Sequence, residues 1–212
     1  MRSILVINAK GGCGKSTLAT NLAGFYAGRG HSVALADYDP QGSSLDWLQA
    51  RPEDYPEIQG LNASDGNVKV ARNTEYLIMD VPAAVHGKDL TSIIRRAQTL
   101  LIPVLPSPMD MRAAAHFIEE LLTVGKVDRK QVKLGVVANR VRENTLIYHT
   151  LEQFIKRLGI PRVGTLRDSQ NYIRAAERGL SLFEMAPSMV ATDLEQWQKI
   201  TRWLNSKRSM PD

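Results

Sequence analysis

One segment near the start of the chain constrains the fold more than any other. It reads ILVINAKGGCGKSTLATNLA over residues 4–23: an apolar run, a glycine-rich loop, and a stretch in which Leu18, Leu22 and Phe25 recur at helical spacing. A buried strand, a tight loop and a helix in this order are the context that a phosphate-binding loop requires. The segment therefore predicts an α/β fold with a phosphate site between its first strand and first helix.

The residue types of this loop suit a nucleotide triphosphate. Glycines allow a tight turn whose backbone N–H groups face phosphate oxygens, and the start of the following helix adds the positive end of its dipole. Lys15 is expected to reach the β- and γ-phosphates, Ser16 to hold Mg²⁺ and Thr17 to contact the α-phosphate. The predicted nucleotide-binding residues of the loop are Gly11, Gly12, Cys13, Gly14, Lys15, Ser16 and Thr17.

The loop differs from the strict pattern G-x-x-x-x-G-K-[ST] in two ways: it lacks one glycine, and it has one additional lysine. Ala9 stands where that pattern has a glycine. Lys10 is a second lysine, and Lys15 alone already supplies the amine that such a loop uses. Lys10 therefore needs a separate explanation.

Apolar runs and helical patterns alternate along the chain. Strands are expected at residues 4–9, 32–37, 75–80, 99–106 and 132–140, and helices at 16–29, 43–50, 88–97, 109–124 and 145–158. Residues 51–72 are less regular, with a short edge strand expected near Ile58. This alternation predicts a mostly parallel, twisted sheet with helices on both faces, a three-layer fold in which residues 1–212 form a single domain.

Three carboxylates follow the predicted strands. Asp37 and Asp39 come at the end of the second strand, and Asp80 ends the third. The carboxyl ends of strands in an open α/β sheet meet at the ligand crevice. There the three side chains can hold Mg²⁺, usually through water, or orient an attacking water molecule.

The charge of the chain is uneven. The net charge is +5, but residues 1–125 carry 11 Lys and Arg against 13 Asp and Glu, whereas residues 126–212 carry 16 against 9. A basic C-terminal part can meet a polyanion, either nucleic acid or acidic lipid. Cys13 is the single cysteine, so no disulfide is expected. With no signal-peptide pattern and no apolar run of roughly 20 residues, the expected location is the cytoplasm.

The last predicted helix has two interpretations. Leu194, Trp197, Ile200 and Leu204 fall on one face of it. The helix either docks on the domain or lies in a membrane surface as a basic amphipathic anchor, with Trp203 nearby. The sequence SMPD at the end contains a proline and an acid, which disfavours the anchor.

Four segments, in order, resemble a known family. KGGCGKST, DYDPQGSS, LIMDVP and IPVLPSPMDMRAA look like the motifs of the deviant Walker A ATPases of the ParA/MinD family, and RAAERGLSLFE resembles that family's C-terminal segment. The likeness covers most of the chain. It is greatest to the short ParA-type partition ATPases that lack an N-terminal DNA-binding extension. The resemblance implies a P-loop NTPase fold that binds ATP and Mg²⁺.

The resemblance also implies roles for individual residues. Lys10 would reach across a homodimer to the partner's phosphates, which makes dimerisation depend on ATP. Asp39 would polarise the hydrolytic water, and Asn139 would read the adenine edge. The implied catalytic residues are Lys10, Lys15 and Asp39, and the implied Mg²⁺ residues are Ser16, Asp37 and Asp80. Ala83 and Ala84 depart from the family's commoner proline-rich sequence, which leaves the switch segment 81–88 open.

The activity implied is weak, Mg²⁺-dependent ATP hydrolysis that times a change of state. The ATP-bound dimer would bind nucleoid DNA non-specifically, and a centromere-binding or adaptor protein would stimulate hydrolysis and release. This cycle would drive partition of a plasmid or chromosome, or position another cargo. Arg174 and Arg178, four apart on a predicted helix, would share a DNA-binding face. The full predicted DNA set is Lys156, Arg157, Arg162, Arg167, Arg174 and Arg178.

One alternative function stays open. A MinD-like ATPase that cycles on a membrane would use the same nucleotide site but would need the last helix to enter lipid. Membrane binding is the less expected of the two. An iron–sulfur relative is excluded, because a bridging cluster needs a cysteine pair from each subunit and Cys13 stands alone.

Overall fold

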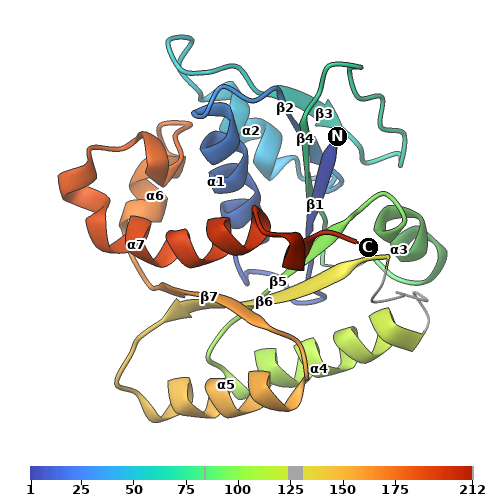
Figure 1. Ribbon diagram of the computed structural model, residues 1–212, viewed down its shortest axis with the longest axis vertical. Coiled ribbons are helices and arrows are strands. Elements are labelled where there is room, and N and C mark those ends of the chain that lie inside the picture. Colours follow the sequence, from blue (N-terminus) through green and yellow to red (C-terminus); the bar gives the residue numbers. More distant parts are fainter. Residues whose placement is uncertain (84, 124–130, 212) are drawn as a thin grey trace.

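A seven-stranded parallel sheet forms the centre of the protein (Figure 1). The computed structural model describes residues 1–83, 85–123 and 131–211. The strand order is β3-β2-β4-β1-β5-β6-β7, and every pairing is parallel. The strands are β1 (Arg2–Val6), β2 (Val33–Asp37), β3 (Gln59–Asn62), β4 (Tyr76–Asp80), β5 (Thr99–Val104), β6 (Lys133–Val141) and β7 (Arg162–Arg167).

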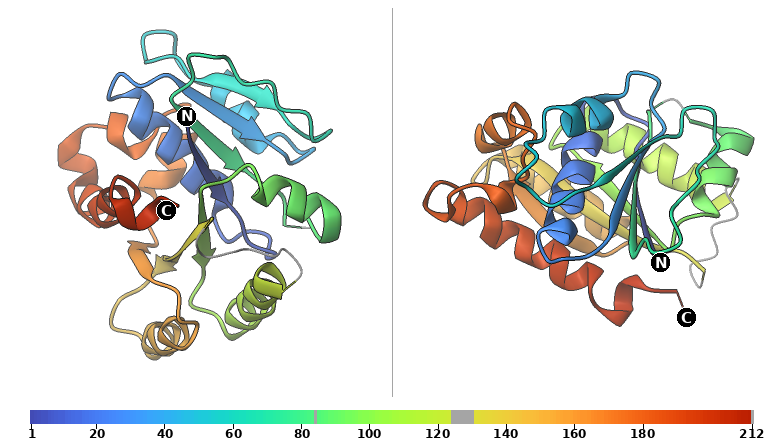
Figure 2. Two further views of the ribbon diagram at one scale, coloured as in Figure 1. Left: turned by 45° about the vertical axis from the view of Figure 1, so that its right-hand side comes forward. Right: turned by 90° about the horizontal axis from the view of Figure 1, so that it is seen from above.

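Helices cover both faces of the sheet, which confirms the predicted three-layer fold (Figure 2). Side chains alternate along each strand, so that in β1 Ile4 packs against one helical layer and Leu5 against the other. One face carries α1 (Lys15–Ala27), α2 (Ser43–Gln49), α6 (Asn171–Ala176), the 3₁₀ helix η1 (Leu182–Glu184) and α7 (Pro187–Leu204). The other face carries α3 (Gly87–Ile94), α4 (Pro108–Thr123) and α5 (Leu146–Arg157).

Strand β1 and helix α1 occupy the middle of this arrangement. β1 pairs with β4 on one side and with β5 on the other, with Arg2 opposite Tyr76 and Ile4 opposite Thr99. All residues of α1 from Leu18 to Ala27 are buried, since sheet and neighbouring helices enclose the helix. The loop between these two elements is therefore anchored at both ends in the best-packed part of the molecule.

The predicted elements are present, with ends displaced by a few residues. The edge strand expected near Ile58 is β3, whose bounds are Gln59–Asn62. The predicted end of the fourth helix at Val124 lies outside the described residues, as does Ala84.

Strand β7 has no counterpart in the sequence prediction, because arginines bound it and a glycine interrupts it. Gly164 is needed there for packing: a Cβ on it would lie 2.3 Å from Cγ1 of Ile200 in α7.

Helix α7 docks on the sheet through its apolar face, as one of the two interpretations predicted. Trp197, Ile200 and Leu204 are almost fully buried. Trp203 packs over Gly135 of β6, where an added Cβ would lie 2.9 Å from the indole ring. The face that a membrane anchor would insert is thus occupied by the protein's own core. In the described part of the chain, no helix is both long and apolar enough to cross a bilayer.

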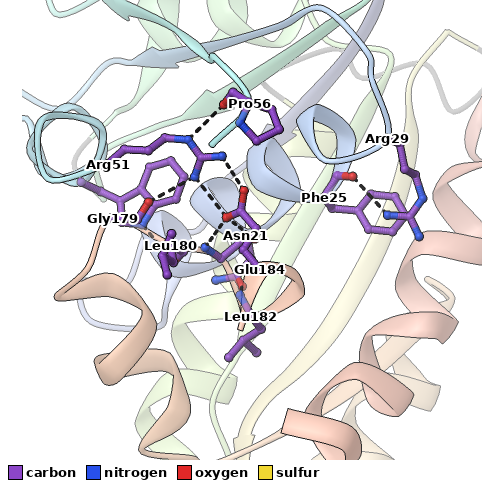
Figure 3. Close-up of polar contacts among 11 residues, drawn as sticks. Asn21, Phe25, Arg29, Arg51, Pro56, Gly179, Leu180, Leu182 and Glu184 are labelled. Atoms are coloured by element: carbon purple, nitrogen blue, oxygen red, sulfur yellow. Dashed lines mark hydrogen bonds and ion pairs between the residues drawn. The ribbon is translucent and has the colours of Figure 1, made fainter. Parts of the chain in front are cut away.

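A buried ion pair joins the connection after α2 to the 3₁₀ helix η1 (Figure 3). The guanidinium of Arg51 contacts the carboxylate of Glu184, and both side chains are less than a tenth exposed. Arg51 also donates to the carbonyl oxygens of Gly179 at 3.2 Å and Pro56 at 3.1 Å. Asn21 of α1 accepts the N–H of Leu182 at 2.8 Å, so the same segment is also tied to the helix of the phosphate loop.

Candidate nucleotide-binding site

The glycine-rich loop has the backbone that a phosphate site requires. Gly12 and Gly14 have φ of 74° and 95°, values that residues with a side chain rarely adopt. No side chain caps the start of α1 at Lys15, so the N–H groups of its first turn are available to an anion. A Cβ on Gly14 would also lie 2.3 Å from Nδ2 of Asn139, which makes glycine necessary there for a second reason.

The two lysines of the loop differ in their surroundings. Nζ of Lys15 donates to the carbonyl oxygen of Lys10 at 3.2 Å, and Sγ of Cys13 donates to the same oxygen at 3.2 Å. The N–H of Lys10 is fixed by Oδ1 of Asn8 at 3.2 Å. The backbone of Lys10 is therefore held on both sides. Its ammonium group, by contrast, has no hydrogen bond or ion pair with any residue that the structure describes.

Cys13 has a packing role in this loop. Its side chain is fully buried, and burial raises the pKa of the thiol. The thiol therefore stays protonated at neutral pH, which leaves it a poor nucleophile. Its contact with the Lys10 carbonyl helps to close the loop.

Asp80, Ser44 and Asp37 form a buried polar cluster at the ends of two adjacent strands. Oγ of Ser44 donates to Oδ2 of Asp80 at 2.6 Å. Asp37, paired with Asp80 in the sheet register, accepts the N–H groups of Asp39 and Ser44, each at 2.9 Å. Burial raises the pKa of Asp80 to about 6, although hydrogen bonds from Ser16 and Ser44 lower it. Burial also raises the pKa of Asp37, which three backbone N–H groups oppose.

Asp80 of this cluster and the glycine-rich loop line one pocket of about 360 Å³. Lys15, Ser16, Thr17, Asp39 and Asp80 all face it. Oδ1 of Asp39 accepts the N–H of Gln41 at 3.0 Å, which orients the carboxylate. The predicted phosphate, hydroxyl and water-orienting groups are thus brought together, whereas Asp37 is not among the lining residues because its oxygens receive backbone N–H groups at the start of α2.

The donor set of this pocket fits a magnesium ion. Mg²⁺ takes hydroxyl and carboxylate oxygens and keeps several of its own waters. The hydroxyl of Ser16 hydrogen-bonds Asp80, and Asp80 is only 2% exposed, so its ionised carboxylate needs compensation that water cannot supply. A divalent cation beside these two residues would supply that compensation.

A second pocket, of about 270 Å³, lies on the other side of the loop. Asn139 forms part of its wall, and its Nδ2 donates to the carbonyl oxygen of Cys13 at 2.8 Å. The rest of the wall comes from the loop itself and from the turn after β7, namely Gly12, Gly14, Thr17, Arg140, Asp168, Ser169, Gln170, Tyr172 and Ile173. The position beside the phosphate loop suits a nucleobase. The amide of Asn139 is already used by the loop, so the expected adenine contact stays a prediction.

Sequence reasoning missed Ser44 and the turn at residues 168–170. Ser44 joins both carboxylates but is one serine in a polar loop, DPQGSS, with no strand or charge to mark it. The turn at 168–170 follows β7, a strand that the pattern did not predict. Its two large apolar residues, Val163 and Leu166, are three apart and therefore lack the period-two alternation that indicates a strand.

The predicted DNA-binding residues do not form one surface. Lys156 and Arg157 lie in the last turn of α5, whereas Arg174 lies in α6 on the opposite face of the sheet (Figure 1). The shared helical face predicted for Arg174 and Arg178 is also wrong, because α6 ends at Ala176.

The two arginines that bound β7 are engaged in ion pairs. Nε of Arg167 lies 2.6 Å from Oδ1 of Asp193, a fully buried residue of α7. Nη1 of Arg162 lies 2.6 Å from Oε1 of Glu152 in α5. Their charges are largely compensated within the fold. Arg174 and Arg178 are exposed and have no ion pair with any residue that the structure describes.

The comparisons with known proteins agree with this site. Residues 4–183 match the model of the CobQ/CobB/MinD/ParA nucleotide binding domain. The chain is 30% identical over 190 residues to the maintenance of carboxysome distribution protein A of Halothiobacillus neapolitanus, which covers 86% of this chain and 87% of that protein. It is 24% identical to the septum site-determining protein MinD of Synechocystis, over 84% of this chain and 80% of the relative.

Solved structures show the same fold. Apo McdA of Cyanothece aligns with a TM-score of 0.76 at 17% identity, over 95% of this chain and 99% of that chain. The MinD cell division protein of Aquifex aeolicus aligns with a TM-score of 0.75 at 18% identity, over 98% of each chain. Both are P-loop folds with this sheet. The matched domain covers the phosphate loop, Asp39, Asp80 and Asn139, and the chain therefore belongs to the ParA/MinD family of nucleotide-binding ATPases.

Proposed function

We propose that this protein is a ParA-type switch: ATP joins two copies into a sandwich dimer that binds nucleoid DNA non-specifically, and hydrolysis separates them. A centromere-binding or adaptor protein would stimulate hydrolysis, and the cycle would partition DNA or position a cargo. The relatives named for carboxysome distribution make positioning of a large protein assembly as plausible a task as partition.

The observation that carries the proposal is the unpartnered amine of Lys10. Its backbone is fixed inside the phosphate loop by Asn8, Cys13 and Lys15, yet its ammonium meets no carboxylate among the described residues. Lys15 lines the nucleotide pocket, where it would bind the phosphates of ATP held by the same chain. A second rigidly based amine beside the first is well suited to neutralise the phosphates of a facing copy.

Apolar side chains on the same edge of the sheet support an interface there. In a parallel sheet the helices that follow the strands begin at the carboxyl edge, where the phosphate loop also lies. Met109 in the first turn of α4 is 68% exposed and Leu146, the first residue of α5, is 87% exposed. Ile173 of α6 is 52% exposed. Large apolar residues exposed around a nucleotide site are expected where a partner covers them.

Hydrolysis would depend on few groups. Lys15 and the N–H groups of the loop hold the β- and γ-phosphates, and Lys10 of the facing copy adds positive charge as the transition state develops. Asp39, oriented by the N–H of Gln41, positions the attacking water. Mg²⁺, held by Ser16 and Asp80 with waters, would neutralise phosphate charge. Asp39 is partly exposed in the pocket wall, so slow turnover is expected until a partner closes the site.

The DNA-binding surface that the structure favours is smaller than the one predicted. Arg174 and Arg178 are exposed, and Ile173, which precedes Arg174, lines the second pocket. Dimerisation would bring two such pairs to one side of the assembly. Contacts of this kind bind phosphates without reading bases.

The dimer is tested by sedimentation equilibrium with ATP, ADP and no nucleotide. The wild-type protein is expected to dimerise with ATP alone, while Lys10→Ala still binds ATP but stays monomeric. Lys15→Ala is the control that loses nucleotide binding itself. ATP-dependent dimers of unchanged affinity in Lys10→Ala would refute the cross-subunit role.

The DNA step is tested by co-sedimentation with non-specific duplex DNA in the same three nucleotide states. Arg174→Ala with Arg178→Ala is expected to weaken ATP-dependent retention about tenfold and to flatten its dependence on salt. Lys156→Ala with Arg157→Ala removes the same charge from the opposite face and should have less effect. Equal losses for the two pairs would show that net charge, and not this surface, governs retention.

A further inference from the structure

A concavity lies away from the nucleotide site, along the edge of the sheet. It is a groove of about 570 Å³ between α2, the connection that follows it, and β3. Its apolar walls are the side chains of Leu45, Leu48, Pro52, Tyr55, Pro56 and Ile58. Gly60 of β3 forms its floor with backbone alone, since an added Cβ would lie 3.0 Å from Leu48 and 3.1 Å from Leu45.

Strand β3 leaves one edge of the sheet open beside this groove. It pairs with β2 on one side, and among the described residues no strand pairs with its other side. Three of its four residues are exposed. An extended peptide can add to such an edge through main-chain hydrogen bonds, with alternate side chains entering a neighbouring groove.

Two acidic side chains line the groove, in a protein that is basic as a whole. Residues 39–66 contain six Asp and Glu and a single basic residue, Arg51. Glu53 and Glu57 line the groove itself and are exposed. The charge of Arg51 does not cancel theirs, because its guanidinium is buried against Glu184 (Figure 3). Two exposed carboxylates in the wall of a groove favour a cationic ligand over an anionic one.

We propose that this groove binds an extended, cationic segment of a partner protein, which adds to β3 as a further strand. Its apolar side chains would enter between Leu48 and Tyr55, and its Lys or Arg residues would face Glu53 and Glu57. None of the residues that line the groove also lines the nucleotide pocket. The inference stands whether or not the chain dimerises or binds DNA.

The probe is a fluorescent nine-residue peptide in which lysine and valine alternate, titrated into the nucleotide-free protein and followed by anisotropy. Saturable binding is expected. Glu53→Lys with Glu57→Lys should weaken it about tenfold, since two attractions become repulsions. Glu119→Lys with Glu195→Lys, exposed residues on α4 and α7, makes the same change in net charge and should leave binding within about twofold. Equal losses in both double variants would overturn the proposal.

Further variants separate the contribution of apolar side chains to peptide binding from that of main-chain hydrogen bonds. A peptide of alternating lysine and glycine keeps the charge but should bind at least about tenfold more weakly, because it cannot fill the groove. The lysine–valine peptide with alternate amides N-methylated should also lose binding. Gly60→Val, checked for an unchanged unfolding temperature, should block the groove. Undiminished binding in these three arms, or no saturable binding by the parent peptide, would refute strand addition here.

Discussion

Replacing Asp80 by asparagine should make the nucleotide-free protein more stable at alkaline pH while removing its function. Burial raises the pKa of Asp80 from 3.8 to about 6. The folded protein therefore holds this proton more tightly than the unfolded chain does. The resulting stabilisation is fully present below pH 3.8 and is lost as the pH rises through about 6. A difference of about two pKa units corresponds to about 3 kcal/mol, the cost of the ionised carboxylate at pH 8.

Asp80→Asn removes this cost without changing the shape of the side chain. Ser44 can donate to the new amide oxygen as it now donates to Oδ2 of Asp80. The free energy of unfolding in urea should rise by up to about 3 kcal/mol at pH 8, and by less than about 1 kcal/mol at pH 4. Mg²⁺ with ATP should raise the unfolding temperature of the wild type much more than that of the variant.

A single outcome would refute the reasoning about Asp80. If Asp80→Asn is less stable than the wild type at pH 8, with an unchanged urea m-value, the carboxylate is already compensated within the chain. The same measurements on Asp39→Asn provide the control, because Asp39 is partly exposed and its replacement should change stability little at either pH.

Two other predictions concern backbone space and buried charge. Gly14→Ala should lower the free energy of unfolding by about 1–3 kcal/mol and abolish ATP binding, because φ is 95° and the new Cβ would meet Asn139. Gly11→Ala is the control: its Cβ would meet nothing within 4 Å, so the free energy of unfolding should change by less than about 0.5 kcal/mol. Arg51→Ala should cost about 3–5 kcal/mol in urea denaturation by leaving Glu184 buried and unpaired, and Arg51→Met with Glu184→Leu should recover most of it. A loss below about 1 kcal/mol for Arg51→Ala would mean that water reaches the carboxylate.

The sequence predicted those parts of the molecule that depend on local pattern. Central strands such as β2 are buried on both faces and therefore read as continuous apolar runs, and the phosphate loop is a contiguous motif. Strand β7 was not predicted because it is an edge strand with charged ends. Its Gly164 is required by close packing against Ile200, a residue far along the chain that the local sequence does not reveal.

Proximity in sequence misled the prediction of the DNA surface. Arg157 and Arg174 are separated by strand β7, and the connections on either side of it cross to opposite faces of the sheet. Two residues that are close in the sequence therefore lie on opposite faces of the sheet. Ser44 was missed for the related reason that its partners, Asp37 and Asp80, come together through strand pairing and not through spacing.

The position of β1 between β4 and β5 has a consequence for how the chain folds during synthesis. The neighbours of Arg2 and Ile4 in the sheet are Tyr76 and Thr99, so the first strand made obtains its second neighbour only when β5 has been synthesised. Pairings between such distant residues are slow to form. A nascent chain that ends before β5 contains the whole phosphate loop. It lacks one of the two strands that pair with β1, the strand that precedes this loop. We therefore expect nascent chains to retain ATP only when they extend beyond β5. ATP retention would then indicate that the centre of the domain has formed.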